Sequence, residues 1–291
     1  MENLSNIGVV KDILARHGFS FSKGLGQNFL INPTVCPKMA EQGNAQPGWG
    51  IIEIGAGFGV LTAQLAQRAD KVVCIEIDQR LLPILAETLE EFNNIKIIIN
   101  QDVLKVDLNS LIAQEFPHMP VAICANLPYY ITSPIIMKIL EDRLPITSLT
   151  VMVQKEAAQR ICAQPGTREV GAVSIAVQYY AQPQILFPVS RGSFMPSPDV
   201  DSAVIRLDIR PQPLVQVAKE EDFFRVVKGA FSQRRKTLSN TLSSSFGLSK
   251  AQTARWLEEA GVSASLRAEQ LSMEQFAQIA NAYTALYDTK E

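Results

Sequence analysis

The sequence predicts an α/β protein: a doubly wound, mostly parallel sheet with an antiparallel edge strand, followed by a small all-α C-terminal domain. Short apolar runs rich in β-branched residues alternate with amphipathic segments, which is typical of βαβ units whose strands are covered on both faces. Beyond residue 211 the apolar residues keep only helical spacing, which predicts helices without strands. The length of 291 residues suits one large domain and one smaller domain.

The first four strands are short and almost continuously apolar. They are expected at residues 49–55, 71–77, 95–100 and 121–126. Helices are expected after the first three of them, at residues 60–69, 79–92 and 106–116. Because parallel strands are joined by right-handed crossovers, this order predicts a twisted parallel sheet.

The alternation of strands and helices continues beyond the fourth strand. A helix is expected at 133–141, with Thr132 and Ser133 as candidate N-caps and Pro134 in its first turn. A fifth strand and two helices are expected next, at 148–154, 155–163 and 171–181.

The last part of the sheet and the C-terminal helices complete the pattern. Two further strands are expected to pair across a proline-rich loop and to form the antiparallel edge, at 182–189 and 202–210. The C-terminal helices are expected at 220–231, 235–246, 249–261 and 272–287.

The composition excludes several classes of protein. With 47% hydrophobic and 19% charged residues the chain is globular, and no apolar stretch is long enough to cross a bilayer, so a soluble cytoplasmic protein is expected. The four cysteines are scattered without zinc-ligand spacing and are expected to be buried thiols. Only two histidines are present, His17 and His118, and no metal site is expected.

One segment is cationic although the net charge of the chain is −2. No acidic residue interrupts residues 223–242, which carry Arg225, Lys228, Arg234, Arg235 and Lys236. Such a segment fits either a solvated helix face or a surface that binds nucleic acid, and the sequence pattern alone leaves both open.

A glycine-rich turn, EIGAGFGVLT at 53–62, lies directly between an expected strand and an expected helix. Gly55, Gly57 and Gly59 allow the backbone to turn sharply and to approach a ligand closely, beside the free amides of a helix start. The G-x-G-x-G spacing differs from the dinucleotide fingerprint G-x-G-x-x-G, which disfavours NAD. The alternative is that the glycines serve only close strand-to-helix packing.

Two carboxylates follow the next two strands. Glu76 ends the second strand, where a carboxylate accepts hydrogen bonds from ribose hydroxyls. Asp102 follows the third strand, where it is placed to accept from an adenine amino group, although by itself it also fits a helix cap or turn cap. Because the carboxyl ends of parallel strands share one edge of the sheet, a nucleoside site is expected there.

The fourth strand ends in NLPYY, an amide followed by proline and two tyrosines. This motif and others resemble those of the rRNA adenine N6-dimethyltransferase family, within the S-adenosylmethionine-dependent methyltransferases. The matching segments span most of the chain in the family's order: KGLGQNFL (23–30), EIGAGFGVLT, Glu76, QDVLK (101–105), NLPYYITSPI (126–135), FMPSPDVDSAV (194–204) and AFSQRRKTLSNTL (230–242). Ala56 stands where many members have proline, which is expected to alter the stiffness of the turn more than its ligand.

The resemblance implies a Rossmann-like catalytic domain at 1–210, which includes N-terminal helices and a cofactor-covering loop at 1–48, and a helical rRNA-recognition domain at 211–291. It implies S-adenosyl-L-methionine as cofactor and a monomeric enzyme. The QRRKTLSNTL segment most resembles the bacterial small-subunit enzymes, which dimethylate two adjacent adenosines in the 3′-terminal hairpin of 16S rRNA during small-subunit biogenesis. The implied partner is 16S rRNA within the small subunit or its precursor.

The resemblance also implies roles for individual residues. The Asn126 side chain and the Leu127 carbonyl would accept the two N6 hydrogens of the target adenine, while Pro128 sets the chain direction and Tyr129 and Phe194 clamp the base. For each ring alone a core position is the alternative, and Tyr130 is expected to pack inward. The implied cofactor-binding residues are Asn28, Leu30, Gly55, Gly57, Glu76, Asp102 and Asn126. The cationic residues of 223–242 would contact rRNA phosphates.

Three other functions stay open at this point. A related enzyme would dimethylate a 23S rRNA adenosine and give antibiotic resistance. A NAD-dependent oxidoreductase is disfavoured by the glycine spacing and by the lack of a proton-transfer residue near Asn126. A ribosome-assembly factor without methylation as its main role is the third alternative.

Overall fold

The computed structural model describes residues 4, 6–20 and 27–287. The chain forms two compact units: Met1–Ala158 with Gln184–Ile209, and Gln159–Pro183 with Arg210–Glu291. The chain enters the second unit for the last time at Arg210, next to the boundary expected from the sequence. Residues 159–183 group with the C-terminal helices, whereas the sequence placed them in the first domain. The roles assigned to the two domains stay predictions.

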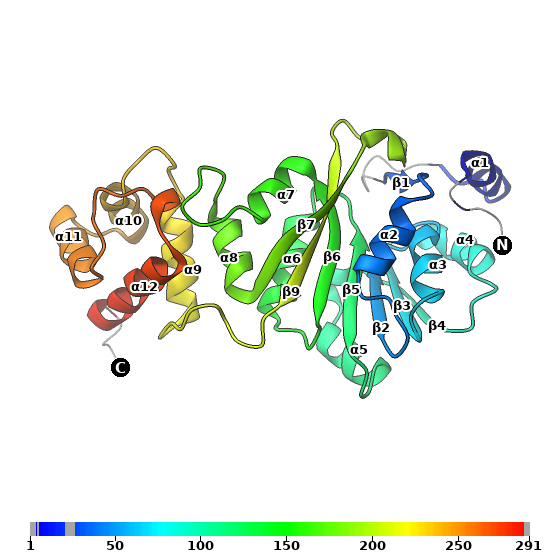
Figure 1. The fold of residues 1–291 in the computed structure, drawn as a ribbon, viewed down its shortest axis with the longest axis horizontal. Helices are drawn as coiled ribbons and strands as arrows, with labels where there is room; N and C mark the ends of the chain where they lie inside the picture. The colour runs from blue at the N-terminus through cyan, green and yellow to red at the C-terminus, as the bar shows by residue number, and fades with distance from the viewer. Residues whose placement is uncertain (1–3, 5, 21–26, 288–291) are drawn as a thin grey trace. The chain divides into compact units, whose positions relative to one another are not determined.

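The first unit is built on a seven-stranded sheet in the order β4-β3-β2-β5-β6-β9-β7 (Figure 1). The five strands β2 to β6 are parallel and β9 runs antiparallel to β6, which confirms the doubly wound, mostly parallel prediction. The antiparallel strand β9 lies inside the sheet, next to the edge strand β7. The strand bounds are β2 Gly50–Ile54, β3 Lys71–Glu76, β4 Ile95–Asn100, β5 Val121–Asn126, β6 Ser148–Gln154, β7 Ala181–Val189 and β9 Ser202–Ile209.

Helices follow the strands as the sequence pattern predicts. The α-helices in residues 6–180 are α1 Ile7–Arg16, α2 Val35–Gln42, α3 Val60–Ala66, α4 Leu82–Thr88, α5 Leu108–Glu115, α6 Thr132–Glu141, α7 Lys155–Ile161 and α8 Ala172–Tyr180. The N-cap of α6 is Ile131, so the two candidate caps were wrong. Thr132 is already helical, and its hydroxyl donates to the Pro128 carbonyl at 3.1 Å.

The central strands are almost entirely buried, and most of their side chains are apolar on both faces. All residues of β2 are buried, as are the first five of β5. Each fully buried Ile or Leu contributes roughly 1.5–3 kcal/mol relative to an exposed one, so these strands anchor the unit. Three free thiols belong to this interior, those of Cys36, Cys74 and Cys124, whereas Cys162 is partly exposed.

A second, two-stranded sheet was not predicted. Strand β1 (Phe29–Leu30) pairs antiparallel with β8 (Phe194–Met195), so that Leu30 faces Phe194. The contact continues beyond the strands, because the Ile31 amide donates to the Ser193 carbonyl at 2.9 Å. This small sheet joins the N-terminal segment to the loop between β7 and β9.

The second unit consists mainly of helices where the structure describes it, together with the first residues of β7. Its C-terminal helices are α9 Glu220–Ala230, α10 Leu238–Phe246, α11 Lys250–Glu259 and α12 Met273–Tyr287. Phe223, Trp256 and Phe276 are fully buried, and the Trp256 indole donates to the Ile279 carbonyl at 2.8 Å. Helix α8 belongs to this unit because the ring of Tyr179 packs 4.8 Å from that of Phe223. Among the described residues no helix is long and apolar enough to cross a membrane.

Candidate functional site

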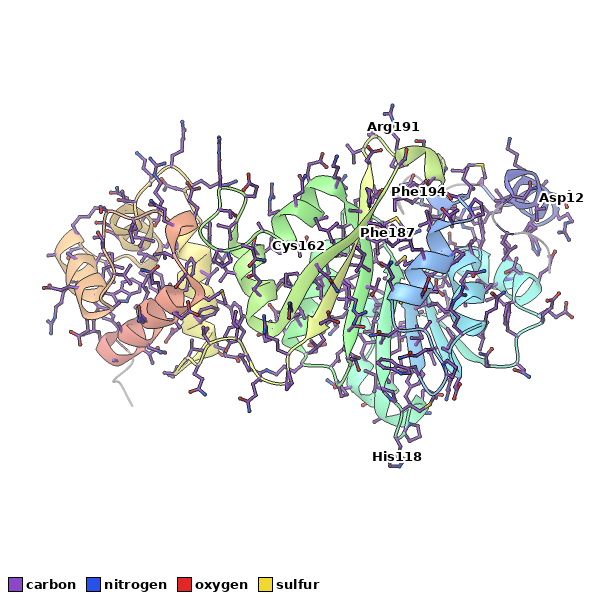
Figure 2. The ribbon with its side chains drawn as sticks, viewed as in Figure 1. Asp12, His118, Cys162, Phe187, Arg191 and Phe194 are labelled. Carbon is purple, nitrogen blue, oxygen red and sulfur yellow. The ribbon has the colours of Figure 1, made fainter. Side chains whose placement is uncertain are left out.

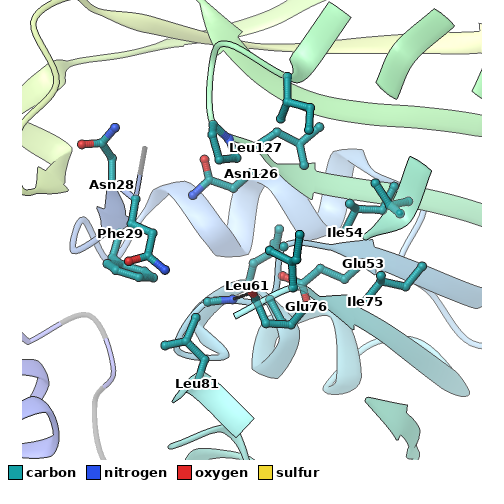
Figure 3. A pocket seen from close by; sticks show the side chains of 18 of the residues that line it. Asn28, Phe29, Glu53, Ile54, Leu61, Ile75, Glu76, Leu81, Asn126 and Leu127 are labelled. Carbon is teal, nitrogen blue, oxygen red and sulfur yellow. Dashed lines mark hydrogen bonds between the residues drawn. The ribbon is translucent and has the colours of Figure 1, made fainter. Parts of the chain in front are cut away.

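A pocket opens at the carboxyl ends of β2, β3 and β5, where an open α/β sheet binds its ligands (Figure 3). Its empty volume is about 1140 Å³, part of which is open to solvent. Every residue that the sequence assigned to catalysis or to cofactor binding lines this pocket: Asn28, Leu30, Gly55, Gly57, Glu76, Asp102, Asn126, Leu127, Pro128, Tyr129 and Phe194. The structure therefore brings the whole predicted set together.

The glycine turn between β2 and α3 forms the floor of the pocket. Gly55 and Gly57 have φ angles of +80° and +58°, a region that side-chain-bearing residues rarely adopt. A Cβ on Gly57 would lie 3.0 Å from the ring of Phe29. The turn thus requires glycine both for its conformation and for the close approach of the N-terminal segment.

Glu76, the last residue of β3, connects the glycine turn to the end of this strand by hydrogen bonds. Its two carboxylate oxygens accept from the Gly57 amide at 3.0 Å and from the Asp78 amide at 2.9 Å. Burial raises the pKa of Glu76, while the backbone hydrogen bonds oppose this shift. Each oxygen keeps a second lone pair, so the carboxylate is still able to accept from a ligand hydroxyl.

A second acid in the pocket, Glu53, was missed by the sequence reasoning. Glu53 is only 1% exposed, and burial together with the nearby charge of Glu76 raises its pKa to about 8. The Cys74 thiol donates to one of its oxygens at 3.8 Å. The sequence did contain a signal for this residue. A carboxylate inside an apolar strand that is covered on both faces has to be buried.

After β3 and β4 the pocket lining includes the apolar side chain of Ile77 and the polar side chain of Asp102. One oxygen of Asp102 accepts from the Leu104 amide at 3.0 Å, so this residue does cap a short helix, Val103–Lys105, while it also lines the pocket. Ile77 is 54% exposed and lines the pocket directly after Glu76. This exposed apolar side chain offers a surface for a flat ring and was not singled out from the sequence.

Asn126 is the last residue of β5 and lies opposite the glycine turn. A Cβ on Gly55 would be 3.5 Å from the Asn126 carbonyl oxygen, so these two backbone segments are adjacent. Figure 3 shows the Asn126 and Leu127 side chains on one side of the pocket, across from Glu53 and Glu76. The amide and the carboxylates therefore face the same cavity.

Three aromatic residues lie near Asn126 in different environments. Tyr129 is partly buried, and its hydroxyl lies 2.6 Å from the Ser202 hydroxyl. Phe194 is 4% exposed and belongs to β8. Tyr130 is 64% exposed, so the expectation that it packs inward was wrong. Its position in the turn after Tyr129 directs it to solvent at the pocket rim.

The N-terminal segment closes the remaining side of the pocket. Asn28 and Leu30 line it, and the Phe29 ring stacks on Phe58 of the glycine turn with centroids 3.9 Å apart. The side chain of Gln27 donates to Asp78 at 2.7 Å. Residues 23–26, the first part of the matched KGLGQNFL motif, lie outside the described residues.

Neither histidine belongs to the pocket. His17 lies 2.6 Å from Glu87, and His118 lies at the end of the sheet opposite to Phe194 (Figure 2). In the part of the chain that the structure describes, no group of three or more His, Cys, Asp or Glu side chains is arranged to hold a metal ion.

The comparison with known families decides the assignment. The family model "Ribosomal RNA adenine dimethylase" matches residues 18–285. The chain belongs to the ribosomal RNA adenine dimethylase family. Its membership makes the protein a methyltransferase, which confirms the resemblance and excludes the oxidoreductase alternative.

The relatives of this dimethylase match it over almost the whole length. "Ribosomal RNA small subunit methyltransferase A" of Geobacillus thermodenitrificans is 50% identical over 290 residues, which cover 98% of this chain and 99% of that protein. The protein of the same name from Bacillus mycoides is 48% identical over 286 residues, which cover 97% and 98% respectively.

Solved structures agree with the dimethylase fold. The 23S rRNA methyltransferase ErmE has a TM-score of 0.66 and 28% identity, covering 88% of this chain and 99% of that chain. A dimethyladenosine transferase from Plasmodium falciparum has a TM-score of 0.73 at 24% identity, covering 88% and 98%, and supports the fold alone.

The cationic residues of the dimethylase belong to the second unit and differ in their contacts. Arg225 lies 4.3 Å from the centre of the Phe246 ring and donates to the Tyr283 hydroxyl at 3.1 Å. Arg234 donates to the carbonyls of Arg168 and Val170. Among the described residues the exposed side chains of Lys228, Arg235 and Lys236 make no hydrogen bond or ion pair. Their role in RNA binding stays a prediction.

Proposed function

We propose that this dimethylase uses S-adenosyl-L-methionine to dimethylate N6 of two adjacent adenosines in the 3′-terminal hairpin of 16S rRNA, during small-subunit biogenesis in the cytoplasm. The supporting observation is that Asn126, Leu127, Tyr129 and Phe194 line one pocket with the glycine turn and Glu76. The identity of about half of all residues with small-subunit relatives favours this substrate.

The residues of the pocket fit a sulfonium nucleoside cofactor. Glu76 is placed to accept from ribose hydroxyls and Asp102 from an exocyclic amine, while exposed Ile77 offers an apolar face for an adenine ring. Gly57 lines the pocket, and its missing Cβ leaves room for the ring of Phe29, which lines the pocket beside it. When bound, the cofactor supplies an electrophilic methyl group on a positively charged sulfur.

On the substrate side, the chain positions the amine rather than removing a proton by a strong base. The amide oxygen of Asn126, at the end of β5, and the carbonyl of Leu127, directly after it, are acceptors in residues that line the pocket. Acceptors on both N6 hydrogens draw the lone pair out of conjugation with the ring and aim it at the methyl carbon. Catalysis then rests mainly on orientation.

Stacking on Tyr129 and Phe194 would hold the target base after it leaves its RNA helix. The exposed cations Lys228, Arg235 and Lys236 would contact phosphates, which position the RNA without reading its sequence. Since one chain supplies every residue of the pocket, we propose that the enzyme acts as a monomer.

The test is transfer of labelled methyl groups to small and large ribosomal subunits from cells that lack these modifications. We expect label in the small subunit, recovered as N6,N6-dimethyladenosine after nuclease digestion. Asn126→Ala is expected to reduce transfer at least about a hundredfold, because it removes an acceptor needed only in the reacting geometry.

The alternative substrate, a 23S rRNA adenosine, is favoured by one observation, the likeness to ErmE with 28% identity. Label in the large subunit alone would establish that alternative. An assembly factor without methylation as its main role predicts no label in either subunit, together with retained binding to small-subunit precursors.

A further inference from the structure

The hydroxyl of Tyr129 is joined to a residue far along the chain. Tyr129 lies in the turn after β5, and Ser202 is the first residue of β9. Their oxygens are 2.6 Å apart, within the range of a strong hydrogen bond between hydroxyl groups. Ser202 is fully buried and Tyr129 is partly buried, so this bond is largely shielded from water.

The backbone around Ser202 is firmly held. Ser202 pairs with Gln154 across β6 and β9. The preceding residue, Asp201, accepts from the Lys155 amide through its carbonyl at 3.0 Å and from the Arg191 amide through its carboxylate at 2.9 Å. The serine hydroxyl therefore has a fixed position relative to the sheet.

Tyr129 is thus held at both ends, by its own backbone in a turn and by its hydroxyl on a strand. A ring attached only through its backbone keeps its χ1 and χ2 rotations, whereas the second attachment excludes most of them. A stacking surface that is ordered before the base arrives binds it with a smaller entropic cost.

Phe194, the second aromatic residue expected to contact the base, is connected to Ser202 by a short loop. Phe194 is the first residue of β8 and Ser202 is the first residue of β9, and the loop of residues 196–201 joins these two strands. The strand before this loop carries the Phe194 ring, and Ser202, directly after the loop, holds the Tyr129 ring through its hydroxyl. The loop therefore connects the supports of both rings.

We propose that Ser202 is a positioning residue, whose hydroxyl holds the Tyr129 ring as one wall of the slot that receives the target adenine. This inference rests on the proposed function, since it takes Tyr129 to stack on the base. Ser202 does not line the pocket and acts only through Tyr129.

A direct chemical role for the Tyr129 hydroxyl is disfavoured. Burial raises the pKa of Tyr129, the bond to Ser202 opposes this shift and the charge of Asp201 adds to it, so the phenol stays neutral and is a poor base. The hydroxyl is also occupied by its contact with Ser202. The bond between Tyr129 and Ser202 therefore serves to position the Tyr129 ring.

The experiment compares Tyr129→Phe, Ser202→Ala and the double variant. Each single variant keeps the ring and removes the same bond, so we expect a fall of about fivefold in kcat/KM for RNA, as for loss of one neutral hydrogen bond. The double variant should lose no more than either single variant. The affinity for S-adenosylhomocysteine, measured by calorimetry, should stay within twofold of that of the wild type.

A matched control separates positioning from general destabilisation. Ser148 is equally buried at the start of β6, and its hydroxyl accepts from Asn44 at 2.8 Å, but it does not line the pocket. Ser148→Ala is expected to keep the activity of the wild type. A hairpin RNA with 2-aminopurine at the target position reports stacking directly, because its fluorescence is quenched by a stacked ring.

Weaker quenching in Ser202→Ala than in Ser148→Ala would support the proposal. Equal quenching and equal kcat/KM in these two variants would overturn it, and so would losses that add in the double variant. If the wild-type protein transfers no methyl group to adenine in RNA, the proposed function itself fails. That result differs from a failure of positioning, in which the wild type is active and Ser202→Ala is equally active.

Discussion

Leu30 and Phe194 are directly paired across the two-stranded sheet formed by β1 and β8. Leu30 belongs to the segment expected to cover the cofactor, and Phe194 is expected to face the target base. The pairing is extended by the contact of the Ile31 amide with the Ser193 carbonyl at 2.9 Å. A movement of one segment would therefore move the other. The cofactor side and the base side of the pocket are linked by this backbone contact.

Phe194→Leu tests the stacking role of this residue. Leucine keeps an apolar side chain of similar volume but removes the flat ring, while the backbone pairing with Leu30 remains. We expect kcat/KM for RNA to fall at least about fivefold, as for loss of one stacked base. The free energy of unfolding should fall by less than about 1.5 kcal/mol, measured by urea denaturation. Unchanged turnover in this variant would show that Phe194 is a core residue only.

Gly57→Ala tests the close approach at the glycine turn. Alanine at a φ of +58° costs about 1–2 kcal/mol, and its Cβ would in addition lie 3.0 Å from Phe29. Gly48→Ala is the control, because Gly48 has a φ of +82° with no atom within 4 Å of the added Cβ. Both variants should be less stable, whereas only Gly57→Ala should weaken the binding of S-adenosylhomocysteine. If calorimetry gave the same affinity for S-adenosylhomocysteine in both variants, the role of the Gly57 turn in cofactor binding would be contradicted.

Glu53→Gln tests the buried carboxyl group. In the unfolded chain this group loses its proton near the ordinary pKa of 4.5, whereas in the folded protein it keeps the proton up to about pH 8. Between these values the unfolded state binds fewer protons, so the free energy of unfolding decreases as the pH rises and levels off above pH 8. Glutamine removes this dependence.

We therefore expect Glu53→Gln to gain stability relative to the wild type between pH 5 and pH 8, measured by urea denaturation at several pH values. Glu41→Gln, a change of an exposed acid, is the control and should follow the wild type. Parallel profiles for Glu53→Gln and the wild type would mean that Glu53 is ionised in the folded protein at neutral pH.

The cationic residues of the second unit are expected to divide into two groups. The double change Arg235→Ala and Lys236→Ala removes two exposed charges, so RNA affinity should fall and the slope of its logarithm against the logarithm of salt concentration should flatten by about 1–2. Filter binding at several salt concentrations measures this slope. An unchanged slope would remove both residues from the RNA contact.

Arg225→Ala should behave differently, because this arginine packs on Phe246 and donates to Tyr283. We expect a loss of stability of about 1–2 kcal/mol, as for a cation–π contact combined with a hydrogen bond. Thermal denaturation measures the loss. A variant of unchanged stability with weaker RNA binding would move Arg225 into the RNA-contact group.

The sequence predicted the site because the polar residues follow strands whose order in the chain reveals the sheet. Gly55, Glu76, Asp102 and Asn126 each lie at or after the end of a parallel strand, and such ends meet at one edge. Their convergence follows from strand periodicity and needs no knowledge of side-chain packing.

The features that the sequence did not predict depend on contacts between segments that are distant in the chain. Strands β1 and β8 have two residues each, too few for any periodic signal. The bond between Tyr129 and Ser202 joins residues 73 positions apart and exists only once β9 is placed beside β6. Tyr130 was misjudged because neighbouring residues in a turn face different directions, which an aromatic dipeptide in the sequence does not reveal.

The buried thiols of the first unit, one in α2 and two in the sheet, have a practical consequence. Burial raises the pKa of Cys36, Cys74 and Cys124, so in the native state they stay protonated and are shielded from alkylating reagents. Cys162, with a pKa raised to about 11 by partial burial, is the most accessible of the four. A fluorophore attached through maleimide chemistry would mark that single position, and the slower reaction of Cys74 in β3 and Cys124 in β5 would time the opening of the β-sheet.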